Sequence, residues 1–418
     1  MYDLKVQYVL FREIVGDIPS TTYATHGLYM YPAKFIPQVV RYVINKYTHE
    51  GEFIFDPFAG YGTVAIEASL TNRNCVLWDL NPMLYLFVNS SLYKDRISLN
   101  DFYIDFNYNE SFNPKWDNVF YWHPTEFYNA LSKIWGYWHK EVDKKLRHLV
   151  AIPLLKITRY FSYSDEKIAK LYRSSYAEEK VKTLLSSSWK DKMFKMYWNY
   201  AREVVEKVRE YQSYKPYQIE CEVRASDEWI FTNKRIIIDA IKEKLEKEVD
   251  VLITSPPYLQ AQEYIRSFKL ELAWLGFIGD FISQLTKHEI PYNNVGEGFI
   301  SSKMYEVLKR EIEKLSHEKL LQLYISYFNS LALFLNNNHA KVKNVIAFFI
   351  GPVKLRNMRI PIDIILKEHL EYLGWKHEVT LIDTIISRRL FKTSKNPATG
   401  LEDERTPTEH LLIMRSKT

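Results

Sequence analysis

The residues best suited to chemistry in this sequence are four consecutive ones, Ser255-Pro256-Pro257-Tyr258. They follow an apolar run at residues 249–254, which predicts a buried strand. The two prolines remove backbone donors and hold the chain in an extended turn, so carbonyl groups there stay free to accept hydrogen bonds. The serine hydroxyl is a further acceptor, and the tyrosine ring offers a flat face. Such a turn could hold a planar base by its exocyclic amino group. Alternatively, it is a proline-rich turn that only ends a strand.

A second candidate site is a glycine turn between a strand expected at residues 53–58 and a helix expected at 64–70. Gly60 and Gly62 in this turn permit a tight bend and a close approach of a ligand to the backbone. Asp79 ends the next expected strand, where a carboxylate can accept hydrogen bonds from both hydroxyl groups of a ribose. Asp79 could instead cap the turn that follows it.

The elements that would carry these residues predict an α/β fold. The order of strand, glycine turn, helix, strand and acid is typical of a parallel βαβ unit. Between about residues 90 and 215 the chain looks mostly helical, and helices are also expected at 308–335 and 361–372. Seven apolar segments are expected to form strands: 53–58, 76–78, 219–223, 249–254, 345–350, 379–386 and 410–414. We therefore expect a doubly wound, Rossmann-like sheet of seven strands with a final hairpin and a largely helical insertion.

Composition excludes several classes of protein. The 418 residues are 47% hydrophobic, enough for a large core, but no stretch approaches 18 apolar residues, so we expect no membrane span. The first residues lack the pattern of a secretory signal. Two cysteines, Cys75 and Cys221, give neither a thiolate zinc site nor a disulfide framework. We therefore expect a cytoplasmic protein without a metal site.

The distribution of charge indicates a polyanionic partner. The net charge is +5, but residues 133–215 hold 19 Lys/Arg and 10 Asp/Glu, a balance of +9, which leaves −4 for the rest (5 − 9). Aromatic residues are interleaved with this charge, as in surfaces that bind nucleic acid. The alternative is a solvated face of ordinary helices.

Several motifs together resemble one enzyme family. The run Thr254–Tyr258 resembles the catalytic motif of S-adenosylmethionine-dependent amino-methyltransferases, and its serine form is most similar to that of the DNA cytosine-N4 branch. The string at 56–63, Asp-Pro-Phe-Ala-Gly-Tyr-Gly-Thr, resembles their cofactor loop. The segment at 25–37, with Tyr-Pro-Ala-Lys-Phe, is similar to one that precedes this loop in a group of cytosine-N4 enzymes. The resemblance covers about residues 21–90 and 218–415.

The resemblance implies S-adenosylmethionine as cofactor and assigns roles to residues. Lys34 could pair with the methionine carboxylate. Asp227 would lie near the adenine amino group, although its context departs from the commoner Gly-Asp-Ala form and a helix cap is its competing use. The expected cofactor-binding residues are Lys34, Asp56, Phe58, Gly60, Gly62, Thr63, Asp79 and Asp227.

The catalytic residues implied by the resemblance are Ser255, Pro256, Pro257 and Tyr258. A target cytosine would leave the DNA helix and stack on Tyr258. Ser255 and the Pro256 carbonyl would then accept hydrogen bonds from the amino group of the base. No thiolate nucleophile is needed, and neither cysteine follows a proline as cytosine-C5 methylation would require.

In this interpretation the chain has three parts. Residues 1–90 form the N-terminal part of the methyltransferase domain with the cofactor loop, and residues 218–418 form its C-terminal part with the catalytic motif. The basic insertion, residues 91–217, falls where a target-recognition region is expected. Its candidate contacts with double-stranded DNA are Arg159, Tyr163, Lys190, Lys192 and Lys195. A cognate restriction endonuclease, in a restriction-modification system, is a further expected partner.

Three other functions remain open at this level. DNA adenine-N6 methylation is one, because the same kind of pocket can hold any exocyclic amine, although adenine enzymes more often carry Asp or Asn before Pro-Pro. RNA guanine-N2 methylation occurs on the same fold. A third alternative is a catalytically inactive subunit that only binds nucleic acid, which the intact Gly60, Gly62, Asp79 and Ser255 disfavour.

Overall fold

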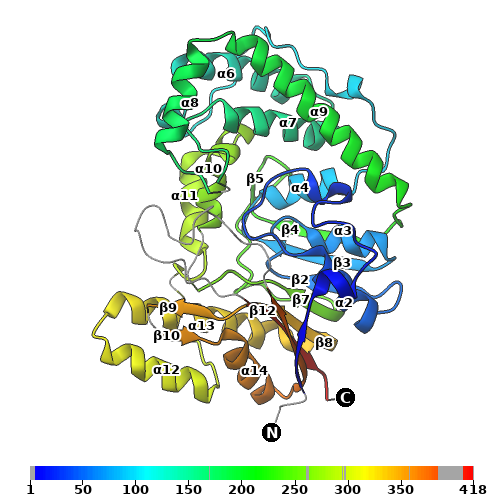
Figure 1. The fold of residues 1–418 in the computed structure, drawn as a ribbon, viewed down its shortest axis with the longest axis vertical. Coiled ribbons are helices and arrows are strands. Elements are labelled where there is room, and N and C mark those ends of the chain that lie inside the picture. Colours follow the sequence, from blue (N-terminus) through cyan, green and yellow to red (C-terminus); the bar gives the residue numbers. More distant parts are fainter. Residues whose placement is uncertain are drawn as a thin grey trace.

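The computed structural model describes residues 5–168, 170–259, 263–293, 295, 298–356, 358–384 and 408–417. An eight-stranded mixed sheet lies at its centre (Figure 1). From edge to edge the strands are β4 (Cys221–Ala225), β3 (Asn74–Asp79), β2 (Phe53–Asp56), β7 (Val249–Thr254), β8 (Val342–Phe349), β12 (Thr408–Arg415), β11 (Lys376–Thr384) and β1 (Val6–Val9). The first five are parallel, β12 is antiparallel to both neighbours, and β1 is parallel to β11.

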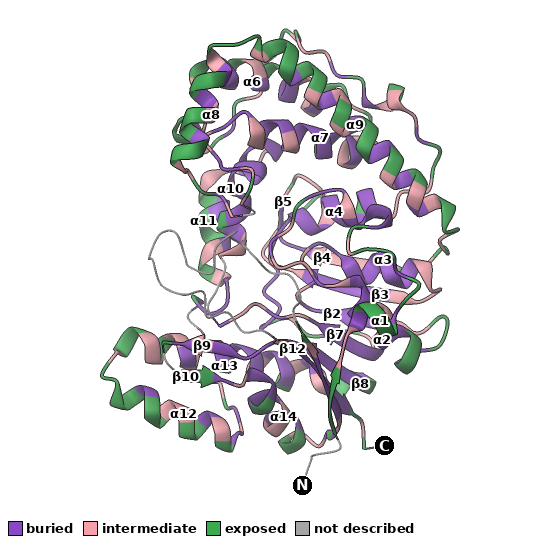
Figure 2. Cartoon of the chain, in the orientation of Figure 1, coloured by how far each residue is buried: buried purple, intermediate pink, exposed green. Residues whose placement is uncertain are grey.

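The sheet is buried on both faces because side chains alternate along its strands. On β2, Phe55 packs in the cluster that includes α13 (Glu318–Asn338) and α14 (Ile362–Tyr372). Its neighbour Ile54 packs in the opposite cluster, with α2 (Pro37–Tyr47) and α3 (Thr63–Leu70). Figure 2 shows the central strands buried and the outer helix faces exposed. Helices on both faces explain why the central strands read as continuous apolar runs.

The order of the strands places a ligand site. The chain builds β2, β3 and β4 outward in one direction, then returns to form β7 on the other side of β2. Doubly wound sheets bind ligands at such a reversal, beyond the carboxyl ends of the strands. The fold is therefore the expected Rossmann-like arrangement, and all seven expected strands are present.

The helical segment between β3 and β4 forms an arc above the sheet (Figure 1). After α4 (Met83–Ser91) its helices are α5 (Val119–Trp122), α6 (Thr125–Lys140), α7 (Arg147–Tyr160), α8 (Ser175–Leu185) and α9 (Trp189–Ser213). Their buried side chains form one cluster with those of α10 (Tyr264–Leu275) and α11 (Gly279–His288), which follow the Pro-Pro motif. The insertion is thus held by helices from the other half of the chain.

The structure differs from the sequence prediction in three places. The helix expected at 308–335 is two helices, α12 (Lys303–Lys314) and α13, because Ser316 has a φ of 51°. The edge strand β1 was not expected, since Val6 and Tyr8 are exposed and give no alternating pattern. Short paired strands also occur: β5 (Asp227–Glu228) with β6 (Arg235–Ile236), and β9 (Val353–Leu355) with β10 (Met358–Ile360).

The two cysteines are neighbours despite their separation in sequence. Cys75 on β3 pairs in register with Cys221 on β4, and their Sγ atoms are 3.2 Å apart as free thiols. Among the helices of the described residues, none combines the length and the apolar character needed to cross a bilayer.

Candidate active site

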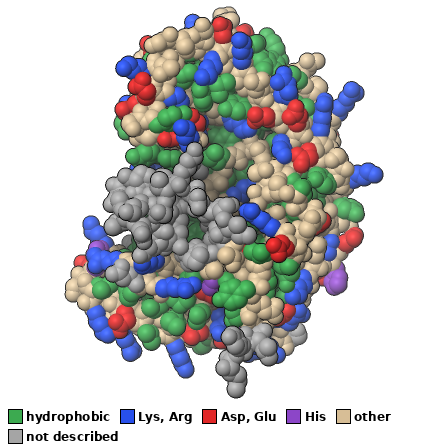
Figure 3. All heavy atoms as spheres, in the orientation of Figure 1, with side chains coloured by type: hydrophobic (Ala, Val, Ile, Leu, Met, Phe, Trp, Pro, Cys, Tyr) green, Lys and Arg blue, Asp and Glu red, His purple; other side chains and the backbone are tan. Residues whose placement is uncertain are grey.

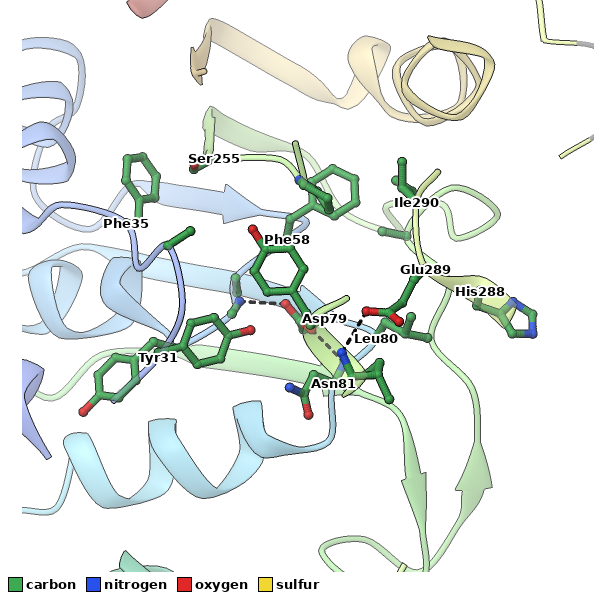
Figure 4. Close-up of a pocket in the computed structure, with 18 of the residues that line it drawn as sticks. Tyr31, Phe35, Phe58, Asp79, Leu80, Asn81, Ser255, His288, Glu289 and Ile290 are labelled. Atoms are coloured by element: carbon green, nitrogen blue, oxygen red, sulfur yellow. Dashed lines mark hydrogen bonds between the residues drawn. The ribbon is translucent and has the colours of Figure 1, made fainter. Parts of the chain in front are cut away.

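A cavity lies beyond the carboxyl ends of β2, β3 and β7 (Figure 4). Its lining includes Gly60 after β2, Asp79 at the end of β3 and Ser255 after β7. The empty space, including the part open to solvent, is about 830 Å³, which is in the range of cofactor sites. The two motifs that are about 200 positions apart in sequence therefore face one cavity at the switch point of the sheet.

The glycine turn requires its glycines for two reasons. Gly60 and Gly62 have φ values of 54° and 84°, a region that residues with a side chain rarely adopt. A Cβ atom on Gly60 would lie 3.1 Å from the ring of Tyr31, which lines the same cavity. A Cβ atom on Gly62 would lie 2.6 Å from Cγ2 of Val88. Gly60 therefore leaves space on the cavity side of the turn, and Gly62 allows close packing against Val88 on the other side.

Asp79 holds this turn and still faces the cavity. Its Oδ2 accepts a 2.7 Å hydrogen bond from the Gly60 amide, and its Oδ1 accepts one of 2.7 Å from the Asn81 amide. Burial raises the pKa of the Asp79 carboxyl to about 6. Each carboxylate oxygen has a second lone pair, so the group can accept hydrogen bonds from hydroxyl groups of a ligand while it anchors the turn. Both uses weighed for Asp79, turn and ligand, are compatible with this geometry.

Lys34 brings a partly buried ammonium group to the cavity wall. Its Nζ donates to the carbonyl oxygen of His26 and lies 4.2 Å from the centre of the Tyr61 ring. Behind it, His26 Nε2 lies 2.8 Å from Oε1 of the fully buried Glu67, whose Oε2 accepts a 2.7 Å bond from Arg41 Nε. Burial lowers the pKa of the Lys34 ammonium to about 7. An anionic group is the natural partner for this side chain.

The Pro-Pro motif leaves β7 directly into the cavity. Ser255 and Pro257 line it, and Pro256 is buried. The Tyr258 hydroxyl donates a 2.6 Å hydrogen bond to Oε1 of Glu409 on β12, which fixes the position of the ring. Figure 4 shows Ser255 and Phe35 at the same end of the cavity, away from His288 and Glu289.

Three expected cofactor-binding residues support the cavity from behind and do not line it. Asp56 is buried; it accepts a 2.7 Å bond from Thr254 Oγ1 and a 3.2 Å bond from the Phe58 amide, and burial raises its pKa to about 7. It thereby joins β7 to the glycine turn. Thr63 is also buried, with its hydroxyl donating to the Phe35 carbonyl at 3.3 Å, and Gly62 packs on Val88. Phe58 lines the cavity as expected.

Asp227 does not line this cavity. Its carboxylate accepts hydrogen bonds from the amides of Ile230, Phe231 and Thr232, so it caps the turn between β5 and β6. This is close to the capping use that competed with the predicted adenine contact. The cavity wall is instead formed by Asp239, Ala240 and Ile241. Residues 238–240 are Ile-Asp-Ala, so the dipeptide at 239–240 shares two of the three residues of the Gly-Asp-Ala form, which is the sequence signal that could have pointed to Asp239.

Two other lining residues were not predicted as site residues. Glu289, at the end of α11, accepts a 2.8 Å bond from the Ile265 amide at the start of α10, and burial raises the pKa of its carboxyl to about 7. Beside it, His288 Nδ1 lies 3.1 Å from Asp239 Oδ2. No local pattern marks Glu289 or His288, because only the packing of α11 brings them to the cavity.

The candidate DNA contacts on the insertion fall into two groups. Arg159 is not placed for a phosphate: its Nη1 lies 2.7 Å from Oε1 of Glu271, and only 11% and 1% of these two side chains are exposed. It joins α7 to α10, and its small exposed part lines a depression together with Tyr160. Tyr163 is half-buried, with the Arg173 guanidinium 4.1 Å from its ring centre. The remaining candidates are exposed on α9: Lys190, Lys192 and Lys195.

Comparisons with known proteins find similarity to DNA methylases and Type II methyltransferases. Residues 16–90 match the N6/N4-type family described as DNA methylase. The chain is 22% identical over 418 aligned residues to Type II methyltransferase M.MvaI of Kocuria varians, covering 91% of this chain and 88% of that one. It is 30% identical over 90 residues to Type II methyltransferase M.MjaII of Methanocaldococcus jannaschii, and this match covers 22% of this chain and 17% of that one.

A third relative, Type II methyltransferase M.BsoBI of Geobacillus stearothermophilus, is 21% identical over 326 residues, covering 67% of this chain and 58% of that one. The chain therefore spans less than two thirds of two of these three relatives. The fold, the cavity and these similarities together support one class: an S-adenosylmethionine-dependent amino-methyltransferase of the N4/N6 type.

Proposed function

We propose that this protein transfers a methyl group from S-adenosylmethionine to an exocyclic amine of a base in DNA, and that this amine is N4 of cytosine. The observation that carries the proposal is that Ser255 lines the same cavity as Gly60 and Asp79. A motif suited to an amino group therefore faces a motif suited to a nucleoside cofactor. The DNA substrate is supported by the matched family, which is described as DNA methylase, and the three relatives are named Type II methyltransferases.

The residues present fit the cofactor. The positive φ of Gly60 keeps the wall beside Tyr31 open, the Asp79 carboxylate can accept ribose hydroxyl groups, and the Lys34 ammonium can pair with a carboxylate. Asp227, by contrast, caps its own turn, and Asp239 is the aspartate of this part of the chain that lines the cavity. When bound, S-adenosylmethionine supplies a methyl group on an already reactive sulfonium.

The protein's contribution is then to position the acceptor. A base in duplex DNA cannot reach the cavity, so it must leave the stack. The ring of Tyr258, fixed by its bond to Glu409, offers a stacking face. The Ser255 hydroxyl and the Pro256 carbonyl would accept hydrogen bonds from the amino group and direct its lone pair into the cavity. No strong base is required before attack, because the proton can leave afterwards.

The choice of cytosine depends on Ser255. The matched family includes enzymes of both the N6 and the N4 type, so the family alone supports only an amino-methyltransferase. Serine before Pro-Pro resembles the cytosine branch, whereas adenine enzymes more often have Asp or Asn there. The three-part division at residues 90 and 217, and a cognate restriction endonuclease as partner, are further parts of the proposal.

The test is to incubate the protein with labelled S-adenosylmethionine and mixed-sequence duplex DNA, digest the DNA to nucleosides and identify the labelled one. N4-methylcytosine is the expected product. N6-methyladenine would keep the class and overturn the choice of base. Label on RNA alone would overturn the DNA substrate, and cofactor binding without any transfer would favour a non-catalytic subunit.

A further inference from the structure

The cofactor cavity continues into a groove that reaches the insertion. A second depression shares Tyr31, Ala33, Lys34 and Phe35 with the cavity. A third depression shares Tyr29, Met30 and Lys156 with the second. Neighbouring depressions therefore share walls all the way from Ser255 past Phe35 to helix α7, and we call this row of depressions the target groove. On the face seen in Figure 3, the molecule is hollowed between the helical arc and the sheet, with hydrophobic and basic side chains in the hollow.

The insertion side of the groove alternates rings and cations. Tyr160 of α7 and Tyr200 of α9 line it and are half-buried. Lys156 Nζ lies 5.0 Å from the centre of the Tyr200 ring, and the Nζ atoms of Lys180 and Lys192 each lie 5.1 Å from that of Tyr160. Surfaces that bind single strands of nucleic acid combine stacking rings with such charges.

The charge of this wall is positive after internal pairing. Lys180 is paired with Glu166 at 2.8 Å and Lys156 with Glu203 at 3.0 Å, so these two lysines are partly neutralised. Lys192 is exposed, and within the described part of the chain it makes no ion pair. Residues 133–215 carry 19 basic and 10 acidic side chains, a surplus of nine. A polyanion fits this wall better than an acidic or neutral protein surface.

The two sides of the groove are held at a fixed separation. Glu271 on α10 accepts a 2.9 Å hydrogen bond from the Tyr29 hydroxyl and pairs with Arg159 of α7. Tyr29, from the N-terminal segment, and Arg159, from the insertion, both line the third depression. All three groups are largely buried. The groove is therefore formed before a ligand arrives, so little binding energy is spent on ordering it.

We propose that the target groove binds the strand of DNA that flanks the extruded base. Tyr160 and Tyr200 stack on flanking bases, and Lys192 with Lys156 contacts the phosphates. The inference rests on the proposed function, because the groove leads to Ser255 and an extruded base stays attached to its strand. It replaces Arg159 as a DNA contact with residues outside the predicted set: Lys156, Tyr160 and Tyr200.

The test uses full-length variants in two assays. Methyl incorporation is measured at subsaturating mixed-sequence duplex DNA, and binding is measured by fluorescence anisotropy on a labelled duplex with a mispaired cytosine, which is easier to extrude. Tyr160→Leu should lower incorporation and duplex affinity about tenfold, while Tyr160→Phe, which keeps the ring, should stay near wild type. Lys192→Glu should weaken binding and reduce the salt dependence of log Kd by about one.

The matched control is Arg310→Glu, the same change of charge at an exposed position of α12, far from the groove (Figure 1). Affinity for S-adenosylhomocysteine, measured by calorimetry, should be unchanged in every variant and reports folding. If Tyr160→Leu fails to fold, the exposed Lys192→Glu still decides the question. The inference is overturned if these variants match Arg310→Glu while wild type methylates DNA. Wild type that methylates no DNA would overturn the proposed function, and the inference with it.

Discussion

In the proposed function, single residues divide the cavity between the acceptor base and the cofactor. Ser255 follows Thr254, whose hydroxyl donates a hydrogen bond to Asp56 of β2. The position of Ser255 is therefore fixed by the sheet itself. Asp79 and Lys34 lie elsewhere in the wall and are fixed by separate contacts, the first to the glycine turn and the second to His26. Changes at Ser255 and at the cofactor-facing residues should therefore be separable in experiment.

Ser255→Ala should lower methyl transfer by roughly 100-fold, because an acceptor directed at the reacting amino group is lost. Affinity for S-adenosylhomocysteine should stay within about twofold, since the cofactor end of the cavity is untouched. Rates with labelled cofactor and calorimetry measure the two effects. Ser283→Ala, at an exposed position of α11, is the control. Equal losses of rate and affinity would rule out the role assigned to Ser255.

Lys34 predicts a dependence on pH. Because burial lowers the pKa of its ammonium to about 7, the group loses its charge as the pH rises above that value. S-adenosylhomocysteine has a carboxylate and 5′-methylthioadenosine has none, so the ratio of their affinities should fall by roughly tenfold per pH unit above 7. Other titrating groups, such as Asp79 and Glu289, affect both ligands and largely cancel in the ratio.

Lys34→Met should make this ratio independent of pH, at the low value that wild type reaches in alkaline solution. Calorimetric titrations at several pH values provide the measurement. A ratio that is flat in wild type would show that Lys34 does not meet the carboxylate.

At the scale of elements, the joint between α7 and α10 is a buried ion pair. Glu271→Gln would leave the Arg159 guanidinium buried without its carboxylate. We expect the free energy of unfolding in urea to fall by about 3–5 kcal/mol. The double variant Arg159→Met/Glu271→Leu should recover most of this loss, because apolar side chains can replace a buried pair.

The control for this joint is the exposed pair Lys140–Glu110, where 57% and 61% of the side chains are accessible. Glu110→Gln should cost less than about 1 kcal/mol. If Glu271→Gln were as mild as this control, the pair would not be what holds the two helices together, and the fixed width of the groove would need another explanation.

At the scale of the whole molecule, the insertion and the sheet share a core. Ile265, Phe268 and Leu272 of α10 belong to the same buried cluster as α6, α7 and α9. Removing residues 91–217 would expose this apolar face to solvent. We expect the shortened chain to aggregate on gel filtration and to lose binding of S-adenosylhomocysteine. A monomeric product with wild-type affinity would instead make the insertion a separable domain.

The parts of the fold that sequence could predict are those with local signals. The apolar runs of β2, β3 and β7 reflect burial on both faces of the sheet, and the glycine turn reflects backbone angles that other residues avoid. The edge strand β1 was missed because its exposed residues carry no such pattern. The break between α12 and α13 was missed because Ser316 adopts a positive φ, whereas such a break is usually recognised in a sequence by a glycine.

The candidate site divides along the same line. Contiguous motifs located Ser255, Gly60, Asp79 and Lys34 from sequence, since a turn after a strand places its own residues at the edge of the sheet. Only tertiary packing decided that Asp239, and not Asp227, lines the cavity, and that Arg159 pairs with Glu271. Both depend on contacts between segments distant in the chain. The sequence by itself determined the class of sheet and which motifs lie at its edge. The tertiary structure decided which charges remain available to a ligand, because burial and pairing depend on neighbours that local pattern does not encode.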